Sequence, residues 1–182
     1  MKNRLRRAVK IFPAFVIGMI LYIAFHELGH LIVAVSAGAT ITEYSIIHAH
    51  TSWVGGTFTI NKYLWVNVNG VLLPILLSYI YALTYSEKIK NGFYKAISFV
   101  VSVVPLGSLI AWVIIPILNT FGIMSKGLAD DDATKFVLYF SVGHHSPIWV
   151  SIGAAAMIAL GVFIVVKKGI IRGWITYIRK SE

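Results

Sequence analysis

Cysteine is absent from the 182-residue chain, which excludes disulfide bonds and thiol catalysis. Charged residues are scarce as well, at 13% of the sequence against about 25% in an average soluble domain. Hydrophobic residues make up 58%. A chain with so little charge and so many apolar residues is expected to be embedded in a membrane.

Four apolar stretches approach or exceed the roughly 20 residues that a helix needs to cross a bilayer. We place them at residues 11–36, 64–84, 94–122 and 147–166. The first run follows a basic start, as in a signal peptide, but it is longer than the 7–15 residues of a signal h-region. The remaining loops are too short for a separate soluble domain. The predicted fold is therefore a single membrane-embedded domain, all-α with about four transmembrane helices, over residues 1–182.

The basic residues are distributed unevenly. A net charge of +9 would suit nucleic-acid binding, but most lysines and arginines lie in the two tails and in the loop between the second and third apolar stretches. Four crossings place these regions on one side of the membrane, which the positive-inside rule identifies as the cytoplasm. We therefore expect a multi-pass protein of the cell membrane with both termini cytoplasmic, and no nucleic-acid partner. The residues are Lys2, Arg4, Arg6, Arg7, Lys10, Lys88, Lys90, Lys95, Lys167, Lys168, Arg172, Arg179 and Lys180.

The first apolar stretch contains the sequence AFHELGHLIV at residues 24–33. His26 and His30 are four residues apart and share a helix face, where both imidazoles can bind one metal ion. Glu27 lies about 100° around the helix, in a position to take a proton from a metal-bound water molecule. Ionisable groups at membrane depth cost at least a few kcal/mol each, which favours a functional site. The alternative is that the histidines hydrogen-bond to neighbouring helices and Glu27 stays protonated.

A catalytic zinc ion usually has three protein ligands and keeps a fourth position for water, so a third ligand is required. An acidic triplet follows the third apolar stretch, which ends on the same side of the membrane as the first. If a helix starts there, Asp132 shares a face with Phe136, which should point into the bundle, whereas Asp131 shares a face with Lys135, which should not. This phasing favours Asp132 as the ligand, then Asp131, then Asp130.

Other groups could supply the third ligand. His48 and His50 share a strand face in the loop after the first stretch, and His144 and His145 follow the predicted amphipathic helix. Loop histidines are more often solvated than bound to metal, so we rank them below the triplet. An Asp before a helical run is also a common N-cap, which gives the triplet a purely structural interpretation.

Three further segments have recognisable patterns. The loop from residue 39 to 62 alternates partly between β-branched or aromatic and polar residues up to Gly55 and Gly56, which predicts a short β-hairpin or β-loop. The second apolar stretch contains NVNGVLLP, in which Gly70 and Pro74 are expected to kink the helix. The basic, aromatic C-terminal sequence GIIRGWITYIRK is typical of a segment at the inner headgroups.

The segment HELGHLIVAVSAGA, with Ala34 and Gly38 after the histidines, and the later VGGTFTI resemble the site-2 protease family of intramembrane zinc metalloproteases. A second helix with Asn69, Gly70 and Pro74, and an Asp after the third helix, add to the likeness. It covers roughly residues 11–136. The family's Asn-Pro-Asp-Gly or Leu-Asp-Gly motif is absent, so the choice among the three aspartates stays open.

The resemblance implies a zinc ion held by His26, His30 and an Asp, with Glu27 as the general base. It implies hydrolysis of peptide bonds in or near transmembrane segments, and it suggests substrate contacts for Asn69 and for the glycine-bearing loop at Gly55 and Gly56.

We accordingly predict a membrane zinc endopeptidase acting on membrane-anchored peptides or single-span proteins, with a homo-oligomer or a regulatory membrane protein as further partners. A non-proteolytic metal-binding or transport protein, or an inactive protease-like sensor, is the alternative.

Overall fold

The computed structural model describes residues 2–123 and 131–179, with side chains from residue 11 onward. Over these residues the chain forms helices and one small sheet. The elements are α1 (Lys2–Ser36), β1 (Ala39–Ser45), β2 (His50–Gly55), α2 (Ile60–Thr84), α3 (Gly92–Thr120), α4 (Asp132–Val142), α5 (Ile148–Lys167) and α6 (Ile170–Arg179).

Four helices in the described part of the chain are long and apolar enough to cross a bilayer. Their bounds differ from the predicted ones by at most four residues. This confirms the predicted class, an all-α membrane protein with a β-hairpin after the first helix. The spans are Ile11–Ser36 within α1, and Ile60–Thr84, Gly92–Thr120 and Ile148–Lys167, which are the whole of α2, α3 and α5.

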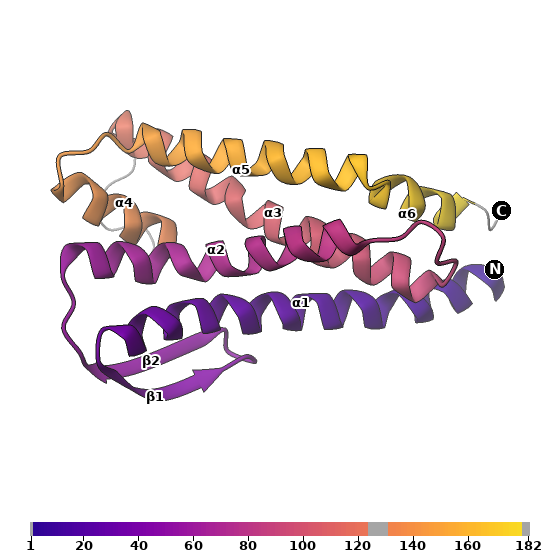
Figure 1. Cartoon of the computed structure of the whole chain (residues 1–182), viewed down its shortest axis with the longest axis horizontal. Coiled ribbons are helices and arrows are strands. Elements are labelled where there is room, and N and C mark those ends of the chain that lie inside the picture. The colour runs from indigo at the N-terminus through magenta and orange to yellow at the C-terminus, as the bar shows by residue number, and fades with distance from the viewer. Residues whose placement is uncertain (1, 124–130, 180–182) are drawn as a thin grey trace.

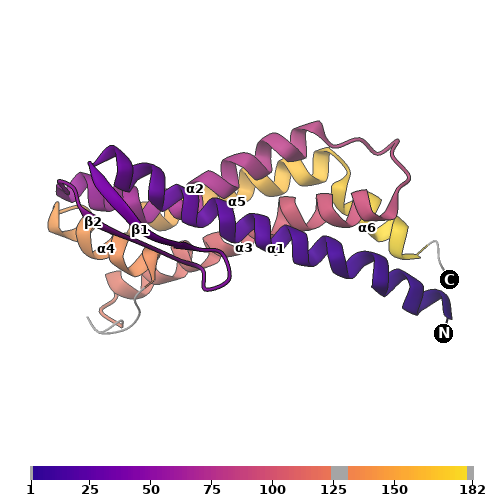
Figure 2. The same ribbon diagram turned by 90° about the horizontal axis from the view of Figure 1, so that it is seen from below.

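The long helices run side by side, and the N- and C-termini lie at the same end of the bundle (Figures 1 and 2). The loop between α2 and α3 and the short helix α6 also lie at this terminal end. The hairpin and α4 lie toward the opposite end, which we call the hairpin end. The arrangement agrees with the prediction that both tails and the α2–α3 loop share one side.

The hairpin folds back along α1 and does not extend away from the bundle (Figure 1). Its strands are antiparallel, and the Tyr44 hydroxyl donates a hydrogen bond to the Ala24 carbonyl at 3.1 Å. Ala24 precedes the end of α1 by twelve residues, so the hairpin reaches about 18 Å along the helix at 1.5 Å per residue. The hairpin therefore stands beside the HELGH segment.

Helix packing relies on hydrogen bonds as well as on apolar contacts, because lipid offers little hydrophobic gain when apolar helices associate. The Ser151 hydroxyl on α5 donates to the Val113 carbonyl on α3 at 2.7 Å. The Tyr79 hydroxyl on α2 donates to the Met157 carbonyl on α5. These bonds join α5 to α3 and to α2. Helix α1 lies on the other side of α2 and α3 (Figure 1).

Candidate metal centre

The helix α1 brings the two histidines of HELGH together, as their spacing predicts. Nε2 of His26 and Nε2 of His30 lie 3.2 Å apart. The other ring nitrogen of His30, Nδ1, lies 2.8 Å from the Val66 carbonyl oxygen on α2. A carbonyl can only accept, so Nδ1 of His30 carries a proton, and Nε2 presents a lone pair when the ring is neutral.

Asp132 completes the group from α4, which begins at this residue. Its Oδ2 lies 3.1 Å from Nε2 of His26 and 3.2 Å from Nε2 of His30. Asp131 caps the helix, because its carboxylate accepts hydrogen bonds from the backbone N–H and the hydroxyl of Thr134 at 2.9 and 2.8 Å. Helix capping thus occupies Asp131 and leaves Asp132 directed at the histidines. Asp130 lies outside the described residues.

The nitrogen and oxygen atoms that meet here need a proton or a metal ion between them. Burial alone would raise the pKa of the Asp132 carboxyl, but hydrogen bonds from the His26 and His30 rings, and the positive charge these rings carry when protonated, outweigh burial and hold that pKa well below its usual range. An ionised carboxylate can only accept, and so can Nε2 of a neutral His30. Two acceptor atoms 3.1–3.2 Å apart repel each other unless a proton on an imidazole or a metal ion lies between them.

The geometry fits a metal ion. The His26, His30 and Asp132 ligand atoms form a triangle with edges of 3.1, 3.2 and 3.2 Å. Ligands about 2.0 Å from a tetrahedral zinc ion lie about 3.3 Å apart, which is nearly the same spacing. Two histidines with one carboxylate are also a ligand set of catalytic zinc, which leaves the fourth position for water. Among the described residues these three form a group that could hold a metal ion, although this does not identify the metal.

Two glycines allow α1 and α2 to approach closely at this level. A Cβ atom on Gly70 would lie 2.5 Å from ring atoms of His30, and one on Gly29 would collide with the backbone carbonyl of Asn69. The side chain of Asn69 donates to the Gly29 carbonyl at 2.8 Å across the same crossing. Gly70 and Pro74, where a kink is predicted, both lie within the continuous helix α2. The absence of a side chain at Gly70 makes room for the ring of His30.

Replacing Gly70 with alanine is expected to lower zinc affinity by about tenfold, because inserting a methyl group displaces His30 from the triangle. Alanine is the better helix former, so helix propensity cannot cause the loss. A chelator competition titration measures the affinity. Gly107→Ala on α3 is the matched control, since a Cβ there meets nothing within 4 Å. Equal affinities in the two variants would contradict the steric role of Gly70.

The candidate metal group lines a polar cavity of about 470 Å³. Glu27, 4% exposed, lies in its wall beside both histidines. The hairpin contributes His50, α2 contributes Asn67, and α4 contributes Lys135. The expectation that Lys135 points away from the site is wrong: three residues after Asp132, it lies only about 60° from it around the helix.

The structure does not bring the other candidate histidines into the metal group. His48 lies 3.2 Å from the Ser45 hydroxyl, and His50, although it lines the cavity, is 2.6 Å from the Ser52 hydroxyl. The ring of His145 packs on Phe140.

Three residues are predicted to contact substrate: Asn69, Gly55 and Gly56. Asn69 bridges α1 and α2, whereas Asn67, which the sequence reading did not select, lines the cavity and is 5% exposed. Gly55 ends β2 and Gly56 follows it, with φ of +69° and +83°, a backbone conformation that favours glycine. Their roles in substrate binding stay predictions.

Comparison with protein-family models, with curated proteins and with solved structures finds no match for the chain.

Proposed function

We propose that the protein is a zinc endopeptidase that hydrolyses peptide bonds in or near the transmembrane segments of membrane-anchored substrates, as the likeness to site-2 proteases implies. One observation carries the proposal. His26, His30 and Asp132 converge as a group that could hold a metal ion, with buried Glu27 beside them, in a polar cavity beside the membrane-spanning helix α1. Simple metal binding would need the three ligands but would not require Glu27.

The residues have distinct roles in this proposal. His26, His30 and Asp132 would hold zinc, and the bound ion would polarise the scissile carbonyl and lower the pKa of a water molecule. Glu27 accepts a proton from the attacking water and delivers it to the amine that leaves when the C–N bond breaks. The hydrogen bond from His30 to the Val66 carbonyl fixes the ring so that Nε2 faces the site.

The hairpin supports an extended substrate. A helix hides its peptide bonds in its own hydrogen bonds, so the cleaved segment must unwind before hydrolysis. His50, Thr51 and Trp53 of β2 line the cavity, which brings strand backbone to the site. An unwound segment could pair with this strand by β-augmentation, which holds it through backbone hydrogen bonds and tolerates different side chains. Substrates with weak transmembrane helices would be favoured.

The distribution of basic residues favours a cytoplasmic position for the terminal end. The metal centre, which lies toward the hairpin end, would then be in the outer half of the bilayer.

Chelation tests the proposal in the unmodified protein. With a synthetic single-span peptide containing a Gly-Pro pair in its membrane segment, reconstituted in vesicles, we expect measurable cleavage by mass spectrometry. A zinc chelator should lower the rate at least about tenfold, and added zinc should restore it, because the ligand group cannot polarise a carbonyl without its ion. Cleavage that continues unchanged in the chelator would contradict a zinc enzyme.

A further inference from the structure

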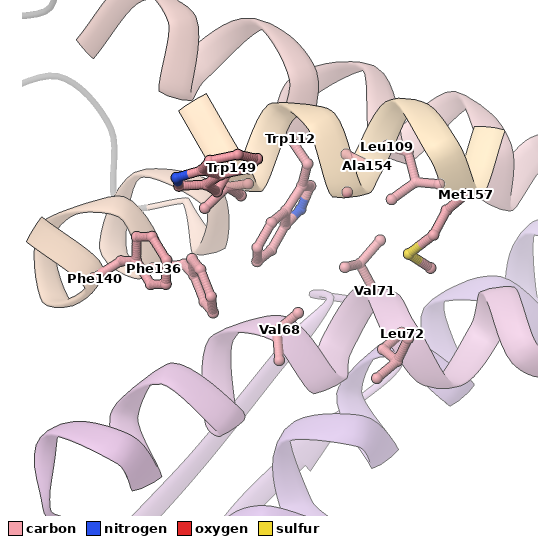
Figure 3. Close-up of a pocket in the computed structure, with 12 residues that line it drawn as sticks. Val68, Val71, Leu72, Leu109, Trp112, Phe136, Phe140, Trp149, Ala154 and Met157 are labelled. Carbon is pink, nitrogen blue, oxygen red and sulfur yellow. The ribbon is translucent and has the colours of Figure 1, made fainter. Parts of the chain in front are cut away.

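A second cavity, of about 260 Å³, lies between α2, α3, α4 and α5 (Figure 3). It shares no lining residue with the cavity of the candidate metal centre. Val68 and Val71 form its α2 wall, and Trp112 of α3 extends toward them from the opposite side (Figure 3). Phe136 of α4 and Met157 of α5 close its two ends. The proposed peptidase chemistry makes no use of this space.

The side chains that line the cavity determine what kind of molecule can bind there. Its lining residues carry aliphatic, aromatic or thioether side chains apart from Gly153, and no carboxylate, amide or ammonium group is among them. An apolar cavity of about 150 Å³ is known to stay free of water and to accept benzene, and this one is larger. Water would find no set of hydrogen-bond partners here, so the occupant should be a hydrocarbon.

Another apolar cavity, of about 360 Å³, adjoins this one and shares Val68, Leu72, Phe136 and Phe140 with it. An unbranched hydrocarbon chain is slender enough to occupy such a space between helices.

The open side of the cavity has a polar border. Trp149 lies there and is 65% exposed (Figure 3). His145, four residues before Trp149, packs on Phe140, whose ring lines the cavity at the same end. Exposed tryptophans are typical of the level of lipid headgroups, where the indole N–H can bond to polar groups. An apolar interior with hydrogen-bond donors at its opening is complementary to an amphiphile.

We infer that this cavity binds one hydrocarbon chain of a membrane lipid, with the headgroup near Trp149 and His145 at the hairpin end. A chain in this position packs against Phe136, which lies one helical turn after Asp132 on the same face of α4. The site is independent of peptidase activity.

Gly153 provides a direct way to block the site. It lines the open side of the cavity, and a Cβ there meets nothing within 4 Å, so Gly153→Phe adds a ring to free space without a backbone collision. Gly107→Phe is the matched control, because Gly107 is also an exposed helical glycine with free space around its Cβ, but it lies outside the cavity.

The experiment uses the full chain purified from vesicles of phosphatidylcholine with a diazirine in one acyl chain. Native mass spectrometry after detergent exchange should find one lipid retained by the wild type and by Gly107→Phe, and at least about tenfold less by Gly153→Phe, since the ring takes the place of the chain. After irradiation, labels in the wild type should concentrate in residues 68–72, 136–140 and 149–157.

Two results would overturn the inference. The first is equal lipid retention by all three proteins, and the second is a label spread evenly over the lipid-facing helices of the wild type. The labelling needs no substitution, so it remains decisive if Gly153→Phe fails to fold. A protein that loses its lipid and doubles in mass would show a second copy at this face, which would also contradict lipid binding.

Discussion

Glu27→Gln is expected to stop peptide-bond cleavage and to leave the metal ion bound. Glu27 is buried beside the ligand triangle but is not part of it. An amide of the same shape cannot accept a proton, and general-base catalysis typically contributes about 10²–10⁴-fold to the rate. The turnover of a membrane-embedded peptide should fall by about this factor. Metal analysis of the same preparation should show as much zinc as in the wild type.

Glu43→Gln is the matched control, because Glu43 is exposed on β1 and does not line the cavity. It should leave the rate unchanged. Full activity in Glu27→Gln would refute the mechanism. If the wild type cleaves no membrane peptide but carries zinc across vesicles, and Glu27→Gln loses that flux, the protein is a metal transporter.

The apolar runs predicted the membrane helices well, but they placed the start of α2 too late in the sequence. The structure begins α2 at Ile60, four residues before the predicted start, with the Thr59 hydroxyl capping the helix at the Lys62 N–H. Hydropathy locates the part of a helix that matches the hydrocarbon layer. Capping residues set where the helix itself begins, and Thr59 is such a residue. Polar residues in the first turn conceal this start.

The candidate ligands could be predicted because side-chain chemistry and helical phase both mark them. The spacing of His26 and His30 brings them together, and the phase shared by Asp132 and Phe136 selects the aspartate that the structure places beside them. That these three residues bind zinc stays a prediction. Asn67 and Gly70 share a face of α2, three residues apart, so the same phasing could have drawn attention to Asn67.

Other parts of the site have no sequence signal. The Val66 carbonyl that orients His30 belongs to the backbone, and any residue could provide it. From the sequence, Gly70 predicts a kink in α2. In the structure, glycine is required at this position because a Cβ atom would collide with the ring of His30, 40 residues earlier in the chain on α1. Such contacts depend on how two helices cross, which a single sequence does not specify.

Asp132→Ala is expected to lower zinc affinity by at least about 100-fold, since even the outer groups that orient metal ligands typically contribute 10–100-fold. The substitution removes the one anionic ligand and leaves two neutral imidazoles, which are too few for a catalytic zinc site. Cleavage should be lost with the metal. Zinc content after gel filtration and peptide turnover in vesicles measure the two effects.

Asp131→Ala separates metal ligation from the structural role of the acidic segment. It removes the cap of α4, with its hydrogen bonds to Thr134, at a cost of about 0.5–2 kcal/mol in helix stability, but it leaves the Asp132 carboxylate in place. Thermal stability should therefore fall while zinc content stays near that of the wild type. If the two variants lose zinc equally, Asp132 acts through the fold of α4. If neither loses zinc, the third ligand comes from elsewhere, and His50 in the cavity wall is the next residue to replace.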